Sequence, residues 1–177
     1  MGRKSVIETE RLILRPWRPS DAESCFEYAS NPLIGQGAGW PPHIGIENTK
    51  QVIRDFLMNP DTYAITLKGD DRAIGSIGLR IGFALFGEIA PEEAEIGYWI
   101  GEPYWGQGLI PEAARALIEY AFTDLNISKL WCGYFETNLK SARVSEKLGF
   151  KYEYTTPPTD PESPARVVTA LLRSEAA

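Results

Sequence analysis

Residues 101–111 read Gly-Glu-Pro-Tyr-Trp-Gly-Gln-Gly-Leu-Ile-Pro, and they stand between a run of β-forming residues and a strongly periodic helical pattern. Glycine lets the backbone turn tightly and approach a ligand, and the first turn of a helix offers unpaired N–H groups at the positive end of its dipole. Pro111 fits this arrangement because the first helical turn does not need its N–H. The stretch therefore predicts an anion cradle, best suited to a pyrophosphate.

Strands and helices alternate on both sides of this stretch. Alternating or β-rich runs bounded by turns predict strands at 11–15, 63–68, 73–81, 94–100, 129–135, 150–154 and 166–172. Helical patterns cover 20–29, 47–57, 138–148 and the segment around 113–121, where Ala113, Leu117 and Ala121 share a face. Residues 20–23 match a capping box, and 31–45 and 155–165 are rich in turn residues and are predicted as loops. This order implies a mixed sheet with helices packed on it.

The composition indicates a globular chain. With 177 residues, of which 44% are hydrophobic and 24% charged, we expect a single domain over 1–177 with a core at about 9–173. The net charge of -6 argues against attraction to nucleic acid or to an anionic membrane. Since neither a signal peptide nor a membrane-spanning run is visible, we expect a cytoplasmic protein.

Cysteine and histidine are too scarce for several kinds of site. Cys25 and Cys132 form no C-x-x-C pair, and His43 is the single histidine, in a Trp-Pro-Pro-His run typical of a loop. We therefore expect both cysteines to be small buried hydrophobes, and we expect neither a catalytic cysteine nor a metal site.

Three interpretations compete for the glycine-rich stretch. A Walker loop is excluded because no Gly-Lys-Ser/Thr follows. A dinucleotide fingerprint needs a third glycine where Pro111 stands, but Glu136 could serve as its ribose-binding acid, so a dinucleotide-dependent oxidoreductase stays open. The third interpretation is a plain turn that only starts a helix.

Four motifs in order resemble the GCN5-related N-acetyltransferase superfamily, in its branch of ribosomal-protein-alanine N-acetyltransferase-like enzymes. They are TERLILRP at 9–16, EIGYWI at 95–100, YWGQG at 104–108, and a run from Asn138 through Ser141 and Arg143 to EKLGF at 146–150. The resemblance covers nearly the whole chain. It implies the acyl-CoA N-acyltransferase fold: an α/β (α+β) domain whose mixed, mostly antiparallel sheet of about six to seven strands is flanked by about four helices.

The resemblance also implies an activity. Such an enzyme moves the acetyl group of acetyl-CoA to a primary amine, either a small molecule or a peptide N-terminus, by direct attack in a ternary complex without a covalent intermediate or a metal. A homodimer is a fair expectation. A non-catalytic acyl-CoA-binding module stays open as an alternative, because Trp105 and Ser145 depart from the family pattern.

Cofactor-binding residues follow by resemblance. The pyrophosphate loop falls on Trp105, Gly106, Gln107, Gly108, Leu109 and Ile110, with Trp105 in place of Gln or Arg and Ile110 in place of Gly or Ala. The segment Tyr98, Trp99 and Ile100 would pair with the pantetheine arm and offer a backbone N–H to the developing oxyanion. Asn138 would bind pantetheine as well as cap a helix. A local excess of positive charge, and not the resemblance, adds Lys140 and Arg143, which would either meet the phosphates or the adenine end of CoA or belong to a solvated helix face.

Catalytic candidates are less well marked. Ser145 stands where the family often has an acidic tyrosine, so we take Ser141 as the candidate acid that protonates the thiolate. Glu95 is the candidate base, with Glu93 and Glu88 in reserve, and Trp40 with Tyr104 would wall the acceptor site. At neutral pH an α-amine with a pKa near 8 is neutral about one-tenth of the time and lysine only about once in a thousand, so an N-terminal substrate needs less help from a base.

Overall fold

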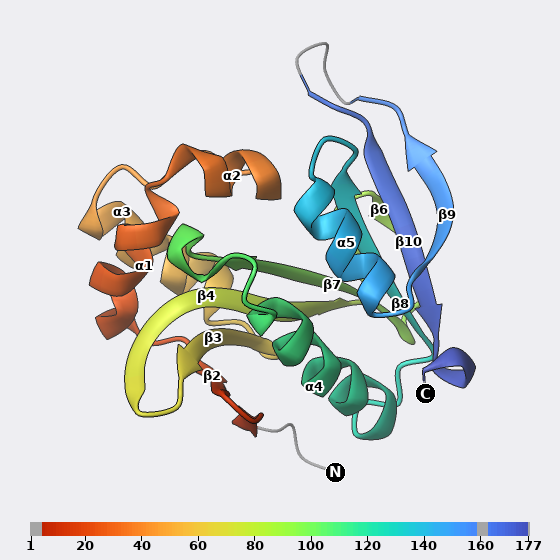
Figure 1. The fold of residues 1–177 in the computed structure, drawn as a ribbon, viewed down its shortest axis with the longest axis horizontal. Helices are drawn as coiled ribbons and strands as arrows, with labels where there is room; N and C mark the ends of the chain where they lie inside the picture. The colour runs from red at the N-terminus through yellow and green to blue at the C-terminus, as the bar shows by residue number, and fades with distance from the viewer. Residues whose placement is uncertain (1–4, 159–162, 177) are drawn as a thin grey trace. The chain divides into compact units, whose positions relative to one another are not determined.

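The computed structural model describes residues 5–158 and 163–176 (Figure 1). By its internal contacts the chain forms two compact units, each built from two stretches of sequence. The first unit is Met1–Gly78 with Tyr98–Leu117, and the second is Leu79–Gly97 with Ile118–Ala177. The prediction of a single domain stays a prediction.

The first unit contains an antiparallel ladder and the helices that follow its second strand. Its strands are β1 (Ile7–Glu8), β2 (Leu12–Pro16), β3 (Thr62–Leu67) and β4 (Asp70–Ile81), in that order, followed by the end of β7 (Glu93–Ile100). Its helices are α1 (Ala22–Ala29), α2 (Pro32–Ala38) and α3 (Ile46–Val52), which continues as a π-helical turn at Ile53–Leu57. A 3-10 turn at Glu102–Tyr104 leads to α4 (Leu109–Thr123), whose first part belongs to this unit.

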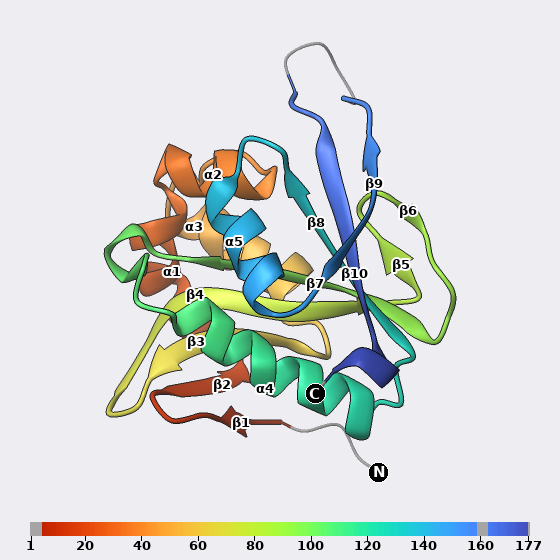
Figure 2. The same cartoon turned by 45° about the vertical axis from the view of Figure 1, so that its right-hand side comes forward.

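The second unit continues the sheet from the ends of β4 and β7. Its further strands are β8 (Lys129–Phe135), β10 (Arg166–Leu172) and β9 (Lys151–Thr156), in the spatial order β4-β7-β8-β10-β9 (Figure 2). The short strands β5 (Phe83–Ala84) and β6 (Gly87–Glu88) pair with each other, and α5 (Leu139–Lys147) packs against β8. The pair β7 and β8 is parallel, whereas β8–β10 and β10–β9 are antiparallel.

The predicted mixed, mostly antiparallel sheet is confirmed, with two differences in its parts. Among the described residues the sheet has eight strands, because the short β1 adds to β2 through Ile7 and Leu14. The helices number five in the same residues, one more than expected, because of α2. The predicted loop 155–165 begins two residues late, since β9 runs to Thr156, and residues 159–162 lie outside the described residues.

The loop predicted over 31–45 was wrong in its first half, where α2 forms. Asn31 caps this helix, because its side-chain oxygen accepts a hydrogen bond from Leu33 N at 3.0 Å, and Pro32 occupies the first turn. A Cβ added to Gly35 would lie 2.4 Å from the Trp40 carbonyl oxygen. This glycine therefore serves close packing inside the helix and not a turn.

The capping box predicted at residues 20–23 was also wrong. The N-cap of α1 is Asp21 and it makes no side-chain cap hydrogen bond. Its carboxylate instead accepts from Arg18 N at 2.8 Å and from both terminal nitrogens of Arg15 at 2.8 and 2.9 Å. The helix is therefore entered through a 3-10 turn at Pro19–Asp21, where Asp21 accepts from the backbone of the N-cap Arg18, and not through a box of Ser20 and Glu23.

The Arg15 guanidinium uses all five of its N–H donors. Besides Asp21, it donates to the side chain and the carbonyl of Asp71, both at 2.6 Å, and to the carbonyl of Pro16 at 3.1 Å. Arg15 is 3% exposed and Asp21 7% exposed. This network ties β2, the start of α1 and the β3–β4 turn together within the first unit.

Apolar side chains fill the core of each unit. In the first, Trp17, Ala22, Cys25, Ile53 and Ala64 form one buried cluster under α1 and the π-helical turn. In the second, the buried side chains come from β7, β8, β10 and the end of α4; they include Ala94, Ile96, Leu130, Cys132, Val168 and Ala121. Both cysteines are buried, as the sequence predicted.

Candidate active site

The glycine-rich loop of the first unit has the backbone of an anion cradle. Gly106 and Gly108 have φ of 73° and 77°, in the left-handed region that residues other than glycine rarely adopt. A Cβ on Gly106 would meet no atom within 4 Å, so the loop is open on that side. In the described part of the chain, the N–H groups of Gly106, Gln107 and Gly108 donate no hydrogen bond.

The unpaired donors continue into α4. The first backbone hydrogen bond of this helix runs from Glu112 N to Gly108 O at 3.1 Å, so the N–H groups of Leu109 and Ile110 belong to the unpaired first turn. Five consecutive residues, 106–110, therefore present N–H groups at the positive end of a helix of 15 residues. Such a run can hold two phosphate groups without any cationic side chain.

Side chains from both ends of the loop fix its shape. Trp105, at the position where the family pattern quoted above has Gln or Arg, donates from Nε1 to the carbonyl of Ile100 at 2.9 Å. Gln107 Nε2 donates to the carbonyl of Pro103 at 2.8 Å. The departure at Trp105 thus has a structural use, because it ties the loop to the end of β7.

Arg11, in the bend just before β2, supports the glycine-rich loop, and this contact was not identified from the sequence. Its Nη1 donates to the carbonyl of Gln107 at 3.1 Å, and its Nε pairs with Glu112 Oε2 at 2.6 Å. The other oxygen of Glu112 accepts from Thr9 Oγ1 and from Arg11 N. The motif at 9–16 was visible in the sequence, but its contact with a residue about a hundred positions later was not.

The end of β7 carries the residues predicted to pair with pantetheine. Trp99 is packed between aromatic rings, with centroid distances of 6.4 Å to Trp17 and 6.0 Å to Trp40. Gly75 on β4 lies so close that an added Cβ would be 2.4 Å from Trp99 O. The first unit therefore contains Tyr98, Trp99 and Ile100 together with the whole glycine-rich loop, and their contacts with CoA stay predictions.

Asn138, Lys140, Ser141 and Arg143 lie on or beside α5 in the second unit. Asn138 is the N-cap, and its Oδ1 accepts from Ser141 N at 3.1 Å. Lys140 and Arg143 are exposed on the helix surface. The capping role of Asn138 is confirmed, whereas the predicted contacts of these residues with CoA stay predictions.

Glu95 is 2% exposed and closely surrounded in the second unit. Its Oε2 accepts from Arg80 Nη1 at 3.1 Å and from Leu85 N at 2.9 Å. Burial raises the pKa of this carboxyl, while Arg80, Leu85 N–H and Arg166 act in the opposite direction. The parallel register of β7 with β8 covers Glu93 to Glu95 and ends there. Glu95 thus stands where the pairing stops, with both donors directed at one oxygen.

The reserve candidates for the base lie in the same unit as Glu95. Glu93 accepts a hydrogen bond from Trp131 Nε1 at 2.7 Å, so its carboxylate is engaged with an aromatic side chain. Glu88 is exposed on β6. Trp131 also contacts Phe86 and Tyr154, at 6.0 and 6.4 Å between ring centroids.

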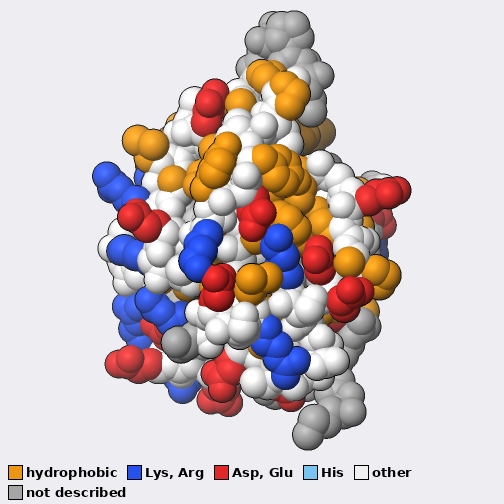
Figure 3. Space-filling model, turned by 90° about the vertical axis from the view of Figure 1, so that its right-hand side faces the viewer, with side chains coloured by type: hydrophobic (Ala, Val, Ile, Leu, Met, Phe, Trp, Pro, Cys, Tyr) orange, Lys and Arg blue, Asp and Glu red, His pale blue; other side chains and the backbone are white. Residues whose placement is uncertain are grey.

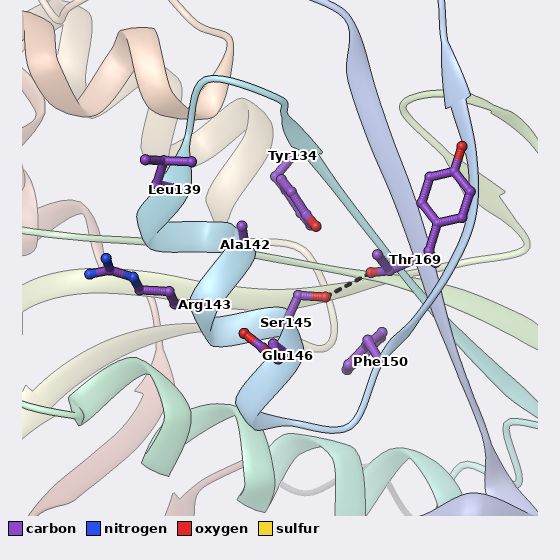
Figure 4. Close-up of a pocket in the computed structure, with 9 residues that line it drawn as sticks. Tyr134, Leu139, Ala142, Arg143, Ser145, Glu146, Phe150 and Thr169 are labelled. Atoms are coloured by element: carbon purple, nitrogen blue, oxygen red, sulfur yellow. Dashed lines mark hydrogen bonds between the residues drawn. The ribbon is translucent and has the colours of Figure 1, made fainter.

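A pocket of about 380 Å³ opens in the second unit between α5 and strands β8, β9 and β10 (Figure 4). Ser145 points to Thr169 there, at 2.8 Å between hydroxyl oxygens, and Thr169 donates to the Cys132 carbonyl at 3.0 Å. Since Thr169 has one proton, Ser145 is the donor to it. Ser145 is 1% exposed and its hydrogen bond to Thr169 joins α5 to β10, and that it is not the acid stays a prediction.

Hydrophobic side chains gather on the face of the molecule that carries β9 (Figure 3). Exposed large side chains of the second unit include Tyr152 on β9 at 65% and Leu85 at 57%. No group of three His, Cys, Asp or Glu placed to hold a metal ion is found in residues 5–158 and 163–176. Within the same residues no helix has the length and apolarity needed to cross a bilayer.

Comparisons with known proteins agree with this geometry. The acetyltransferase (GNAT) domain family matches residues 11–151. The uncharacterized N-acetyltransferase p20 of Bacillus licheniformis is 31% identical over 155 residues, which are 84% of this chain and 83% of that protein. The ribosomal protein uS5-alanine N-acetyltransferase of Escherichia coli is 27% identical, over 81% of this chain and 65% of its own length.

A solved structure shows the same fold. The GNAT-family acetyltransferase of Bacillus anthracis superposes with a TM-score of 0.83 over 96% of this chain and 99% of its own, at 24% sequence identity. At this identity the likeness concerns the fold alone.

Proposed function

Because the chain belongs to the acetyltransferase (GNAT) domain family and is therefore an acetyltransferase, we propose that it transfers the acetyl group of acetyl-CoA to a primary amine. Family membership decides against the dinucleotide-dependent alternative. The structural support for acetyl-CoA is the run of unpaired N–H groups at residues 106–110, which suits a diphosphate.

The strand that enters the loop supports the thioester end of the proposal. A thioester carbonyl becomes an oxyanion when an amine attacks it, and a fixed backbone N–H near the carbonyl oxygen lowers the energy of that charge. The carbonyl of Ile100 is held by Trp105 Nε1, so the end of β7 is rigid where Tyr98, Trp99 and Ile100 would lie along the pantetheine arm. The amine attacks directly, and the thiolate leaves with the electron pair of the C–S bond.

For the acceptor we propose a peptide α-amine. An α-amine is neutral about one hundred times more often than lysine at neutral pH, so it needs less help from a base. A relative at 27% identity is named for acetylating the alanine of a ribosomal protein. The net charge of -6 is compatible with a cationic substrate.

The test is acetyl transfer itself. The untagged protein is incubated with labelled acetyl-CoA and either a short peptide with N-terminal alanine, a peptide with a blocked N-terminus and free lysine, or a polyamine. We expect steady CoA release and a labelled α-amide only with the first. Preference for lysine or polyamine would contradict the acceptor class, and saturable acetyl-CoA binding without turnover of any amine would contradict the proposed activity.

Arg11→Gln tests whether the brace beneath the loop matters for the coenzyme. The change removes the ion pair with Glu112 and the hydrogen bond to the Gln107 carbonyl, both partly exposed, so we expect a loss of about 1 kcal/mol. The KM for acetyl-CoA should rise about fivefold with little change in kcat. The exposed Arg54→Gln is the matched control, and an equal rise in that variant would show a general charge effect.

A further inference from the structure

Deprotonation is the step that the proposed function leaves without a residue. When a neutral amine attacks the thioester, its nitrogen becomes an ammonium, and that proton has to leave before the intermediate reverts. A base with a free lone pair is therefore needed near the attacking nitrogen. Glu95, the sequence candidate, is 2% exposed in the second unit, where Arg80 Nη1 and Leu85 N both donate to its Oε2.

His43 lies in the first unit, on the segment between α2 and α3. Its backbone N–H donates to the Ala29 carbonyl at 3.0 Å, which fixes this segment to the end of α1. Its ring is 5.4 Å from the Trp40 ring, and Trp40 in turn is 6.0 Å from Trp99 on β7. The imidazole thus belongs to the same aromatic wall as the strand segment that would hold the thioester.

The hydrogen bonds of His43 select one tautomer. Thr49 Oγ1 donates to the Gly45 carbonyl at 2.9 Å, which uses its single proton. His43 Nδ1 lies 3.0 Å from the same hydroxyl, so both contacts are satisfied only when Nδ1 carries the proton. Nε2 then bears a lone pair, and no hydrogen bond to it is found among the residues that the structure describes.

We propose that His43 Nε2 is the proton acceptor for the amine, and this inference rests on the proposed acetyl transfer. As the new C–N bond forms, the ammonium proton passes to Nε2, directly or through one water. The C–S bond then breaks, and the thiolate takes the electron pair. The imidazolium later gives its proton to solvent or to the thiolate, which restores the neutral enzyme.

The surroundings of His43 keep it neutral at working pH. Burial lowers the pKa of the imidazole below its usual 6.5, and no charged neighbour contributes. On α3, Glu47 and Lys50 pair with each other at 2.6 Å, and neither this pair nor Glu23 and Glu27 of α1 contribute to the pKa of His43. A base of this strength suits an α-amine better than lysine, whose pKa is about 10.4.

Because the chain has a single histidine, its imidazole NMR signals belong to His43 without further assignment. In untagged protein, the imidazole signals in NMR spectra over a pH series report the pKa and the tautomer of His43 directly. We expect a pKa below 6.5 with Nδ1 protonated. A proton found on Nε2 at neutral pH would overturn the proposal, because the acceptor lone pair would then be absent.

The second measurement is kcat/KM against pH with the peptide bearing N-terminal alanine. Below the pKa of the α-amine, activity falls with a logarithmic slope of about one, and protonation of His43 should steepen it to about two at the pH that NMR reports. His43→Asn keeps a donor for Thr49 but lacks Nε2. We expect kcat lower by about a hundredfold in this variant and a slope that stays near one.

Further variants distinguish His43 from Glu95 as the base, and a catalytic role of His43 from a purely structural one. If Glu95→Gln removes the steeper slope and His43→Asn keeps it, Glu95 is the base and the proposal is wrong. Thr49→Val removes the hydroxyl that accepts from His43 Nδ1, so the tautomer with a lone pair on Nε2 is no longer favoured and kcat should fall. Thr49→Ser keeps the hydroxyl, so its kcat should stay near that of the parent. If the parent turns over and His43→Asn has the same pH profile of kcat/KM, this inference alone is refuted. If the parent protein does not turn over, the proposed function and the inference are refuted together.

Stability gives a readout that does not depend on turnover. Since the pKa of His43 is lowered by folding, the unfolded chain binds more protons between the folded pKa and 6.5. The contribution of His43 to the free energy of unfolding is therefore fully present above pH 6.5 and is lost as the pH falls through the pKa of the folded state. The free energy of unfolding of His43→Asn should decline less on acidification over that window.

Discussion

Gly108→Val is expected to abolish measurable acetyl-CoA binding while the protein still folds. The backbone at Gly108 has φ of 77°, which a β-branched residue adopts only under strain, so the loop must move. Moving it removes at least two charge-assisted hydrogen bonds to the diphosphate, each worth about 2 kcal/mol, and the Kd should rise at least about a thousandfold. Titration calorimetry with acetyl-CoA measures the loss.

Gly45→Ala is the matched control for Gly108→Val. Gly45 has an extended φ of 166°, and a Cβ there meets nothing within 4 Å. This variant should bind acetyl-CoA as the parent does. Far-ultraviolet circular dichroism should show both variants folded. Near-normal affinity in folded Gly108→Val would mean that the diphosphate binds elsewhere, and the proposed cofactor site would be wrong.

Asp21→Asn is expected to cost about 3–5 kcal/mol of the free energy of unfolding, because it leaves the buried Arg15 charge without its main partner. Arg15 and Asp21 form a bidentate pair at 2.8 and 2.9 Å and are almost fully buried. An asparagine can accept one hydrogen bond here, but it cannot neutralise the guanidinium. Urea unfolding at neutral pH measures the difference between the variant and the parent.

Asp71→Asn separates burial from pairing in the same network. Asp71 also pairs with Arg15, at 2.6 Å, but its side chain is 67% exposed. Water screens that charge, so the cost should stay below about 1 kcal/mol. If both variants lost equally little stability, the Arg15 network would not be what holds β2, α1 and the β3–β4 turn together.

Local chemistry explains which parts of the fold could be predicted from the sequence. Strands β8 and β10 have the predicted bounds, because their β-forming runs are flanked by clear turns. Asn138 was recognised as an N-cap because capping depends on three neighbouring residues. The glycine-rich loop was found for the same reason, since its positive φ values and the following helix start are both local.

Tertiary contacts explain what the sequence did not reveal. Gly35 was predicted to lie in a loop, yet it is helical, and the Trp40 carbonyl packs where its Cβ would be. Ser20 and Glu23 fit the spacing of a capping box, but a 3-10 turn at Pro19–Asp21 precedes α1, and the Asp21 carboxylate accepts from Arg15. Arg11 and Glu112 lie about a hundred residues apart, and Arg80 on β4 meets Glu95 on β7, so no single-sequence pattern could pair them.

The burial of the two thiols has a practical consequence for measuring turnover. Burial raises the pKa of Cys25 to about 12, so thiolate is negligible at neutral pH, and Cys132 is likewise shielded from reagents. A chromogenic disulfide reagent added to a reaction should therefore give an absorbance change only from the thiol of the released CoA. A slow rise of two equivalents without substrate would report loss of the native structure, so one cuvette follows both catalysis and integrity.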